Sequence, residues 1–186
     1  QRNKMSTINY AIGCNEDIFG HICDDCPDGV EARVYGLLCV DDDVVFTDTS
    51  DVAEWQTKVA SGDIVVIPNI RGEFDGGAPE YGDGFGKVIE VLKRYRFKLT
   101  YEEESLVSNW NFYNSIKKSR RRRCWPVFGG YVWMTDKPAK WAPKIPVSSN
   151  PLDNVYWNVE VEWTGSDIPE PVAEPEGILQ CFTVGN

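Results

Sequence analysis

The sequence has few of the residues on which most enzyme chemistry depends. It contains one histidine, His21, so a Ser–His or Cys–His catalytic arrangement has no candidate elsewhere in the chain. It also lacks the phosphate-binding GxxxxGK[ST] loop and the GxGxxG, HExxH and GxSxG motifs. Carboxylate pairs suited to glycosidase chemistry are available, but 29 acidic residues would supply such a pair by chance. We therefore expect that the chain is not an enzyme and needs no cofactor.

Long apolar runs and excess basic charge are lacking as well. No run approaches the ~20 apolar residues of a transmembrane helix, so we expect no membrane partner. The formal net charge is −10, which argues against ordinary nucleic-acid binding because such binding requires a basic surface. An acidic surface nevertheless suits a channel through which DNA slides without sticking, because like charges repel.

Aromatic residues and alternating patterns are abundant, and both favour β-structure. The chain has seven Trp, eight Tyr and eight Phe, residue types that prefer strands and interfaces. Apolar and polar residues alternate over residues 155–164 and over 95–101, as in half-buried strands. The apolar positions, which we expect to form one core, are Tyr95, Phe97, Leu99, Trp157, Val159, Val161 and Trp163. The fold class expected is mainly β, a β-sandwich or barrel.

Other segments predict helices, shorter strands and one long loop. A short helix is expected from Asp51 to Gly62, with Glu54 as the capping-box partner of Asp51. The main flanking helix is expected over residues 103–119, where Leu106, Trp110, Tyr113 and Ile116 form an apolar stripe. Short strands are expected over residues 30–40, 44–46, 63–70 and 178–184, and residues 127–134 predict one or two strands with a bend at Gly129–Gly130. Residues 71–86 hold six Gly and one Pro, which predicts a loop of a length that is usually functional.

The chain divides into three parts by composition. Residues 1–30 lack a clear period and predict an extended N-terminal arm. Residues 31–164 carry the strand and helix patterns of a β-rich domain. Residues 165–186 predict a Pro/Glu-rich linker, or C-terminal tail, that ends in a short strand.

The six cysteines leave three interpretations open. Four of them, Cys14, Cys23, Cys26 and Cys39, fall in the first 39 residues, and with His21 they could hold zinc. Structural zinc usually takes two close-spaced cysteine pairs, whereas only one CxxC is present, so free or buried thiols are favoured over zinc and over disulfides. Cys124 and Cys181 accompany apolar runs and are interpreted as core residues.

Four aromatic-rich pieces follow one another between Phe85 and Trp163. They are residues 95–101 (YRFKLTY), 109–114 (NWNFYN), 129–133 (GGYVW) and 155–163 (VYWNVEVEW). In this order of patterns the stretch resembles bacteriophage tail tube proteins. The resemblance implies a β-sandwich or barrel flanked by a helix, assembled into stacked rings, usually hexameric, around a DNA channel. It implies a virion protein that is assembled in the host cytoplasm, with other tail or connector proteins as partners and no catalysis.

Two alternatives accompany this hypothesis. The cysteine-rich first 40 residues have no counterpart in the resemblance, which leaves a connector, ring or baseplate role open. A secreted or surface-displayed β-sandwich that binds carbohydrate or protein is the alternative from another class. Rings or tubes in the microscope would favour the virion hypothesis, and a glycan-binding monomer would favour the binding module.

Charge segregation predicts how an acidic chain could stack on itself. The run Arg120, Arg121, Arg122 and Arg123 is either the solvated end of a helix or a site that docks on an adjacent subunit. We expect inter-subunit contact between this run and an acidic segment such as Asp41, Asp42 and Asp43. Under the tail tube hypothesis, Glu160 and Glu162 are expected to face the DNA channel.

Overall fold

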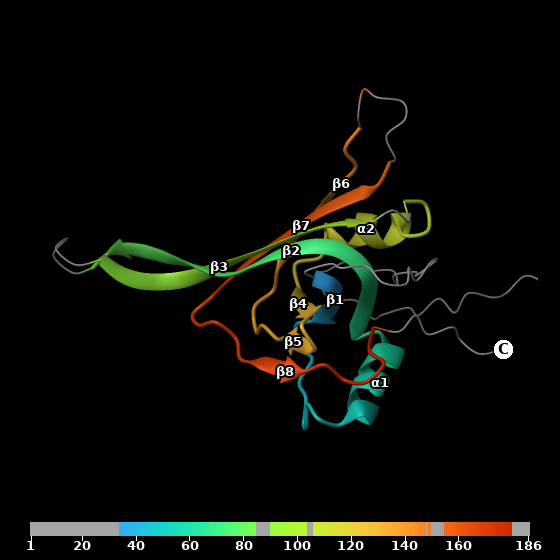
Figure 1. The fold of residues 1–186 in the computed structure, drawn as a ribbon, viewed down its shortest axis with the longest axis horizontal. Coiled ribbons are helices and arrows are strands. Elements are labelled where there is room, and N and C mark those ends of the chain that lie inside the picture. Colours follow the sequence, from blue (N-terminus) through green and yellow to red (C-terminus); the bar gives the residue numbers. More distant parts are fainter. Residues whose placement is uncertain (1–33, 85–89, 104–105, 148, 150–154, 180–186) are drawn as a thin grey trace, which may run out of the picture.

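Antiparallel strands make up most of the chain in the computed structural model, which describes residues 34–84, 90–103, 106–147, 149 and 155–179. Figure 1 shows the eight strands and two helices of these residues. In chain order they are β1 (Val34–Asp41), α1 (Val52–Ser61), β2 (Ile64–Asp83), β3 (Glu90–Glu103), α2 (Trp110–Ile116), β4 (Arg122–Phe128), β5 (Tyr131–Trp133), β6 (Lys140–Lys144), β7 (Trp157–Gly165) and β8 (Pro171–Ala173).

Strand β2 joins two layers of the sheet. The strand order is β6-β7-β3-β2-β1-β4-β5-β8, and every neighbouring pair is antiparallel. The first part of β2, from Ile64 to Gly72, pairs with β1, whereas its later part, from Arg71 to Asp83, pairs with β3. The sheet bends along β2, so that the β1–β4 half faces the β3–β7 half (Figure 1). This arrangement confirms the expected mainly β, sandwich-like fold; within the described residues the sheet ends at β6 and β8 and does not close into a barrel.

The main core lies between the two layers. Side chains from both halves meet there, including Cys39 of β1, Ile67 of β2 and Leu99 of β3, and α2 adds Tyr113. The alternation expected for β3 and β7 is confirmed, because Phe97, Leu99, Trp157, Val159, Val161 and Trp163 are all buried and Tyr95 packs against them. A second cluster lies on the opposite face of β1 and β4, where Trp55 of α1 packs against Trp125.

Helix α1 has the ends that its sequence predicts. The Asp51 side chain accepts a hydrogen bond from the Ala53 backbone N–H, and Gly62 ends the helix in a left-handed conformation with φ of 81°. Glu54 differs from the expected capping box, because its carboxylate accepts from the backbone N–H groups of Thr47 and Asp48. Glu54 therefore holds the preceding loop against the helix instead of closing the cap.

The Gly129–Gly130 pair makes a tight turn between β4 and β5, at the place where a bend was expected. Both residues have positive φ, 63° and 79°, which glycine adopts without steric cost. The turn allows β5 to pair with β4, and β8 then pairs with β5. Residues 171–173, expected to be part of a linker, thus form the last strand of the sheet.

Three expected elements differ in the structure. Residues 71–83 are strand and not loop, because a β-bulge after Asp75 takes up the Gly76–Gly77 pair and keeps the pairing with β3. Residues 44–46 form no strand. The expected helix over 103–119 is shorter: Glu103 continues β3, and α2 covers only Trp110–Ile116. Glu102 and Glu103 therefore belong to the end of a strand and not to the start of a helix.

Several expectations fall outside the described residues. These are the N-terminal arm of residues 1–30, the residues Cys14, His21, Cys23, Cys26 and Cys181, and the terminal strand beyond Leu179. Residues 178 and 179, where that strand was expected to begin, are in a turn.

We predict that Trp163→Ala lowers the free energy of unfolding by about 3–5 kcal/mol, the usual cost of emptying a large aromatic site in a core. The Trp163 ring stacks on Phe97 with 5.5 Å between ring centroids and on Phe74 with 5.7 Å. Urea denaturation is the measurement, and Val107→Ala, at a side chain that is 82% exposed, is the control. Equal losses in the two variants would contradict the core described here.

Candidate functional site

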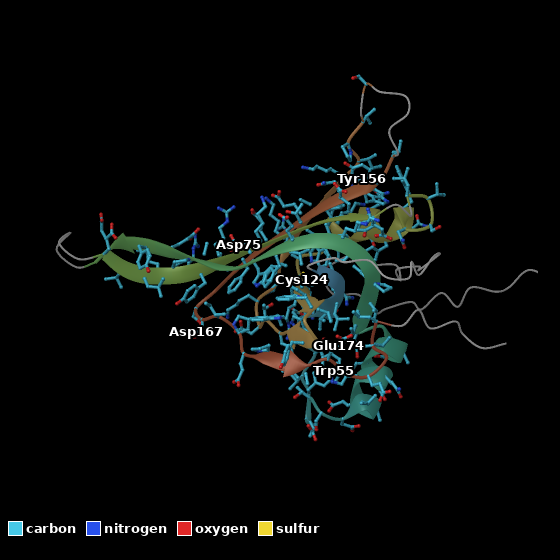
Figure 2. The ribbon with its side chains drawn as sticks, viewed as in Figure 1. Trp55, Asp75, Cys124, Tyr156, Asp167 and Glu174 are labelled. Carbon is cyan, nitrogen blue, oxygen red and sulfur yellow. The ribbon has the colours of Figure 1, made fainter. Side chains whose placement is uncertain are left out.

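The far part of the β2–β3 hairpin projects from the body as an arm, which we define as residues 78–83 and 90–94. Strand β7 ends at Gly165, opposite Tyr95, and β1 reaches β2 only as far as Gly72. Beyond these points the two arm strands pair with each other alone. Figure 1 shows the ribbon extending away from the rest of the sheet, and Figure 2 shows Asp75 at the base of this extension.

The arm exposes apolar side chains together with backbone edges. Tyr81 and Leu92 are directly opposite each other in the register, so they lie on one face, and they are 59% and 39% exposed. Val91, opposite Gly82, is exposed on the other face. An ion pair between Arg94 and Glu80 crosses the ribbon near its base. Both long edges of the arm have backbone groups that no strand of the described chain pairs.

The arginine run lies against the acidic residues of its own chain. Arg121 donates to the Asp42 carboxylate at 2.8 Å, and the Arg122 guanidinium lies 3.1 Å from the Asp41 carboxylate. Asp41 and Arg122 are register partners on β1 and β4, which explains why these distant residues meet. All four of these residues were expected to pair with a neighbouring subunit.

Arg123 completes this intramolecular cluster. Its guanidinium donates to the backbone carbonyls of Asp42 and Val44 and lies 5.9 Å from the Trp125 ring centroid. Arg122 and Arg123 are buried, whereas Arg120 is exposed. The inter-subunit role expected for the run stays a prediction, and Arg120 is the member whose side chain remains most accessible for it.

The electrostatics of this cluster follow from burial and from the arginines. Burial raises the pKa of Asp41 above its ordinary value, and the Arg122 guanidinium opposes this shift. The hydrogen bond from Arg121 lowers the pKa of Asp42. The carboxylate oxygens of Asp41, Asp42 and Asp43 lie within 4.8 Å of one another, close enough to share a cation, but two of the three already face guanidinium groups.

Glu160 and Glu162 lie on the outer face of the sheet and are paired with cations of β3. Glu160 contacts Lys98 at 2.8 Å and Glu162 contacts Arg96 at 2.7 Å, and the first contact lowers the pKa of Glu160. Outside the arm, register and alternation give this face five basic and five acidic side chains between β2 and β6. They are Arg71, Arg96, Lys98, Lys140 and Lys144, and Glu73, Asp75, Glu102, Glu160 and Glu162. The face expected to line a channel is therefore balanced in charge.

Cys39 lies in the core and not in a surface cluster. It is fully buried on β1, opposite the fully buried Cys124 of β4, and both are free thiols. Figure 2 places Cys124 in the middle of the body. The expectation that Cys124 is a core residue is confirmed. The other candidate zinc ligands, Cys14, Cys23 and Cys26, lie outside the described residues.

A buried polar network at the end of β3 was missed in the sequence. The Glu103 carboxylate accepts hydrogen bonds from the Asn109 amide at 2.6 Å and from the Tyr113 hydroxyl, which also contacts the Tyr101 hydroxyl at 3.1 Å. Burial raises the pKa of both tyrosines. The network fixes α2 to the sheet. Extending the alternation of Phe97, Leu99 and Tyr101 by one step would have placed Glu103 on the inner face.

Trp110 belongs to the expected apolar stripe of the helix but is not buried in the core. Its ring lies 5.6 Å from that of Trp157, centroid to centroid, but the side chain is 48% exposed. Because α2 begins at Trp110, this residue lies at the end of the helix and covers the edge of the core. The shorter helix accounts for the difference.

Comparisons with known proteins identify no relative. No protein-family model, no curated protein and no solved structure matches the chain. Neither helix in the part of the chain that the structure describes has the length and apolar character needed to cross a membrane.

We predict that Arg122→Ala lowers the free energy of unfolding by about 2–4 kcal/mol, because it leaves a partly buried carboxylate without its partner. Arg120→Ala, at the exposed end of the same run, is the matched control and should cost less than about 0.5 kcal/mol. Urea denaturation measures both. If the two variants lose equal stability, the ion pair between Arg122 and Asp41 does not stabilise the fold.

The cost of Arg122→Ala should also depend on pH. A carboxyl whose pKa is raised by folding favours the folded protein when protonated and opposes folding when charged. Arg122 offsets the charged form, so its loss should matter at pH 7 and shrink towards pH 3, below the ordinary Asp pKa of ~3.9. A cost that stays constant from pH 7 to pH 3 would contradict this interpretation.

Proposed function

We propose that the chain is a structural subunit that assembles with copies of itself through the hairpin arm. The observation that supports this proposal is the arm itself. It is a two-stranded ribbon that extends beyond the other strands of the sheet, with Tyr81 and Leu92 exposed on one face. A two-stranded hairpin is at best marginally stable in water, so such an arm gains order by packing on another surface.

The other edges of the sheet are less suited to pairing with a second chain. The edge strand β6 has Lys140, Pro143 and Lys144, residue types that discourage pairing with another strand. The edge strand β8 is three residues long and begins with Pro171. The β3 edge of the arm, Glu90 to Arg94, has no proline and includes Val91 and Leu92. Among the described edges, the arm is therefore the one best suited to add a strand or a side-chain face of a second copy.

The resemblance to tail tube proteins extends this proposal to a ring-forming virion protein. In such an assembly the outer face that includes Glu160 and Glu162 is the candidate channel lining. Two of its cations, Arg96 and Lys98, are already paired with carboxylates, so these two offer little attraction to passing phosphates. The proposal requires no catalytic step and no cofactor. A connector or baseplate ring would use the same arm, so the proposal covers this broader class of tail components.

A binding module for carbohydrate or protein is the second candidate. The exposed Trp110 beside Trp157 favours it, because a solvent-facing indole is a common contact surface for sugars and peptides. Trp157 and Trp163 themselves are buried, so they do not form the aromatic platform that this candidate would otherwise use. The oligomeric state distinguishes the two candidates.

We predict that the full chain forms rings or tubes and that Tyr81→Ser combined with Leu92→Ser abolishes them. The double variant removes the apolar face of the arm, while the core residues stay in place, so the fold should persist. Light scattering after size-exclusion and negative-stain microscopy give the oligomeric state. At a concentration where the parent is assembled, we expect the variant to be monomeric, with its assembly midpoint raised by ~10-fold or more.

The matched control is Val147→Ser, which removes an apolar side chain that is 85% exposed but lies outside the arm. This variant should assemble as the parent does. A parent chain that stays monomeric at every concentration, or a double variant that assembles equally well, would overturn the proposed function. A monomer that loses glycan binding on Trp110→Ala would support the binding module instead.

A further inference from the structure

Cys39 and Cys124 occupy a pair of positions with unusual geometry for two free thiols. They are register partners on the antiparallel strands β1 and β4, at the centre of the sheet order, and both side chains point into the main core. Both are fully buried, and no disulfide joins them in the structure. Opposed residues on antiparallel strands alternate between hydrogen-bonded and non-hydrogen-bonded pairs, and the second kind brings the side chains closer together.

The register shows which kind of pair this is. Leu37 is opposite Pro126, and proline has no N–H to exchange, so that pair is of the non-hydrogen-bonded kind. Because the two kinds alternate, Cys39 and Cys124, two positions further along, form a non-hydrogen-bonded pair as well.

Two backbone hydrogen bonds support the same assignment of hydrogen-bonded and non-hydrogen-bonded pairs. The Asp41 N–H donates to the Asp63 carbonyl, towards β2 and away from β4. The carbonyl of Arg122, the partner of Asp41, accepts from the Ala139 N–H and so points away from β1. The Asp41–Arg122 pair is thus also non-hydrogen-bonded, and it lies two positions from the cysteines.

We propose that Cys39 and Cys124 are the site of a cross-strand disulfide. A non-hydrogen-bonded pair has Cα atoms ~4.5 Å apart, within the 4.4–6.8 Å range in which disulfides form without backbone movement. The bond would link β1 to β4, the two strands whose opposite faces contact the two core clusters. This inference does not depend on the proposed function.

The reaction is an exchange with an external disulfide, such as oxidised glutathione. The two cysteine thiols lose their protons and an electron pair, one Sγ–Sγ bond forms, and the glutathione disulfide is reduced to two thiols. Burial raises the pKa of Cys39 to about 12, so the reactive thiolate is scarce while the strands are closed. We therefore expect the bond to form while β1 and β4 are open, during folding.

The test is to unfold the full chain in reducing denaturant and refold it in a buffer of reduced and oxidised glutathione. Free thiols are then alkylated in denaturant, and the protein is cleaved after lysine and arginine, which places Cys39 and Cys124 in separate peptides without any other cysteine. We expect mass spectrometry to find these two peptides joined. Recovery of both as alkylated thiols, or joined to other cysteines, would overturn the proposal.

A second readout is the melting temperature with and without reductant. A disulfide across a loop of this length should raise the melting temperature by ~5–10 °C in the oxidised chain. Cys39→Ala and Cys124→Ala should each abolish the rise, whereas Cys181→Ala should keep it. The rise surviving in Cys39→Ala would also overturn the proposal. The peptide mapping needs no variant, so it decides the question even if a core substitution prevents folding.

Discussion

The structure depends on one strand that pairs on its two sides with different partners. The early residues of β2 complete a ladder with β1, and its later residues complete a ladder with β3. Because the strand bends between these ladders, the two halves of one sheet face each other and bury an aromatic core. Phe74 shows the consequence: from the middle of β2 it contacts Phe97 and Trp163 in one half and Phe128 in the other. The arm is the part of the same strand that continues past the point where the sandwich ends.

The charge pattern of the chain has a different meaning in three dimensions than along the sequence. Basic and acidic segments that are far apart in sequence become neighbours through strand register, as Asp41 meets Arg122 and Glu162 meets Arg96. Most of the segregated charge is consequently neutralised within one chain. An assembly of these chains would need less charge complementarity between copies than the sequence suggests, and apolar contact by the arm becomes more important.

Much of the fold could be predicted because local periodicity and burial agree. The alternation in β7, the two ends of α1 at Asp51 and Gly62, and the Gly129–Gly130 turn all depend on near neighbours, and each is confirmed. The failures occur where distant pairing decides the local structure. Glycine-rich residues 71–83 are strand because β3 is there to pair with them, and Glu103 is strand because β7 pairs with it up to Trp157. No local signal in the sequence reports the partner of residues 71–83, whereas the alternation of Phe97, Leu99 and Tyr101 does extend to Glu103.

The candidate site shows the same division. The arginine run and the acidic triplet were recognisable as a matched set, but whether they meet within a chain or between chains depends on the register of β1 and β4. The first strand of the arm lies within the expected loop of residues 71–86. Its exposed apolar residues give no signal in the sequence, because they stand out only where the structure shows the neighbouring strands β1 and β7 ending. The predicted loop nevertheless includes residues 78–83, which form one strand of the candidate site.

The most direct test of this account is amide hydrogen exchange along β2, measured in the monomeric and the assembled chain. Residues 65–75, which pair with β1 or with β3 in the body of the protein, should be protected in both states. Residues 78–83 and 90–94 should exchange rapidly in the monomer and become protected on assembly, because a hairpin without further partners opens readily. Arm amides that exchange equally fast in both states would contradict the assembly role, and rapid exchange over 65–75 would contradict the fold.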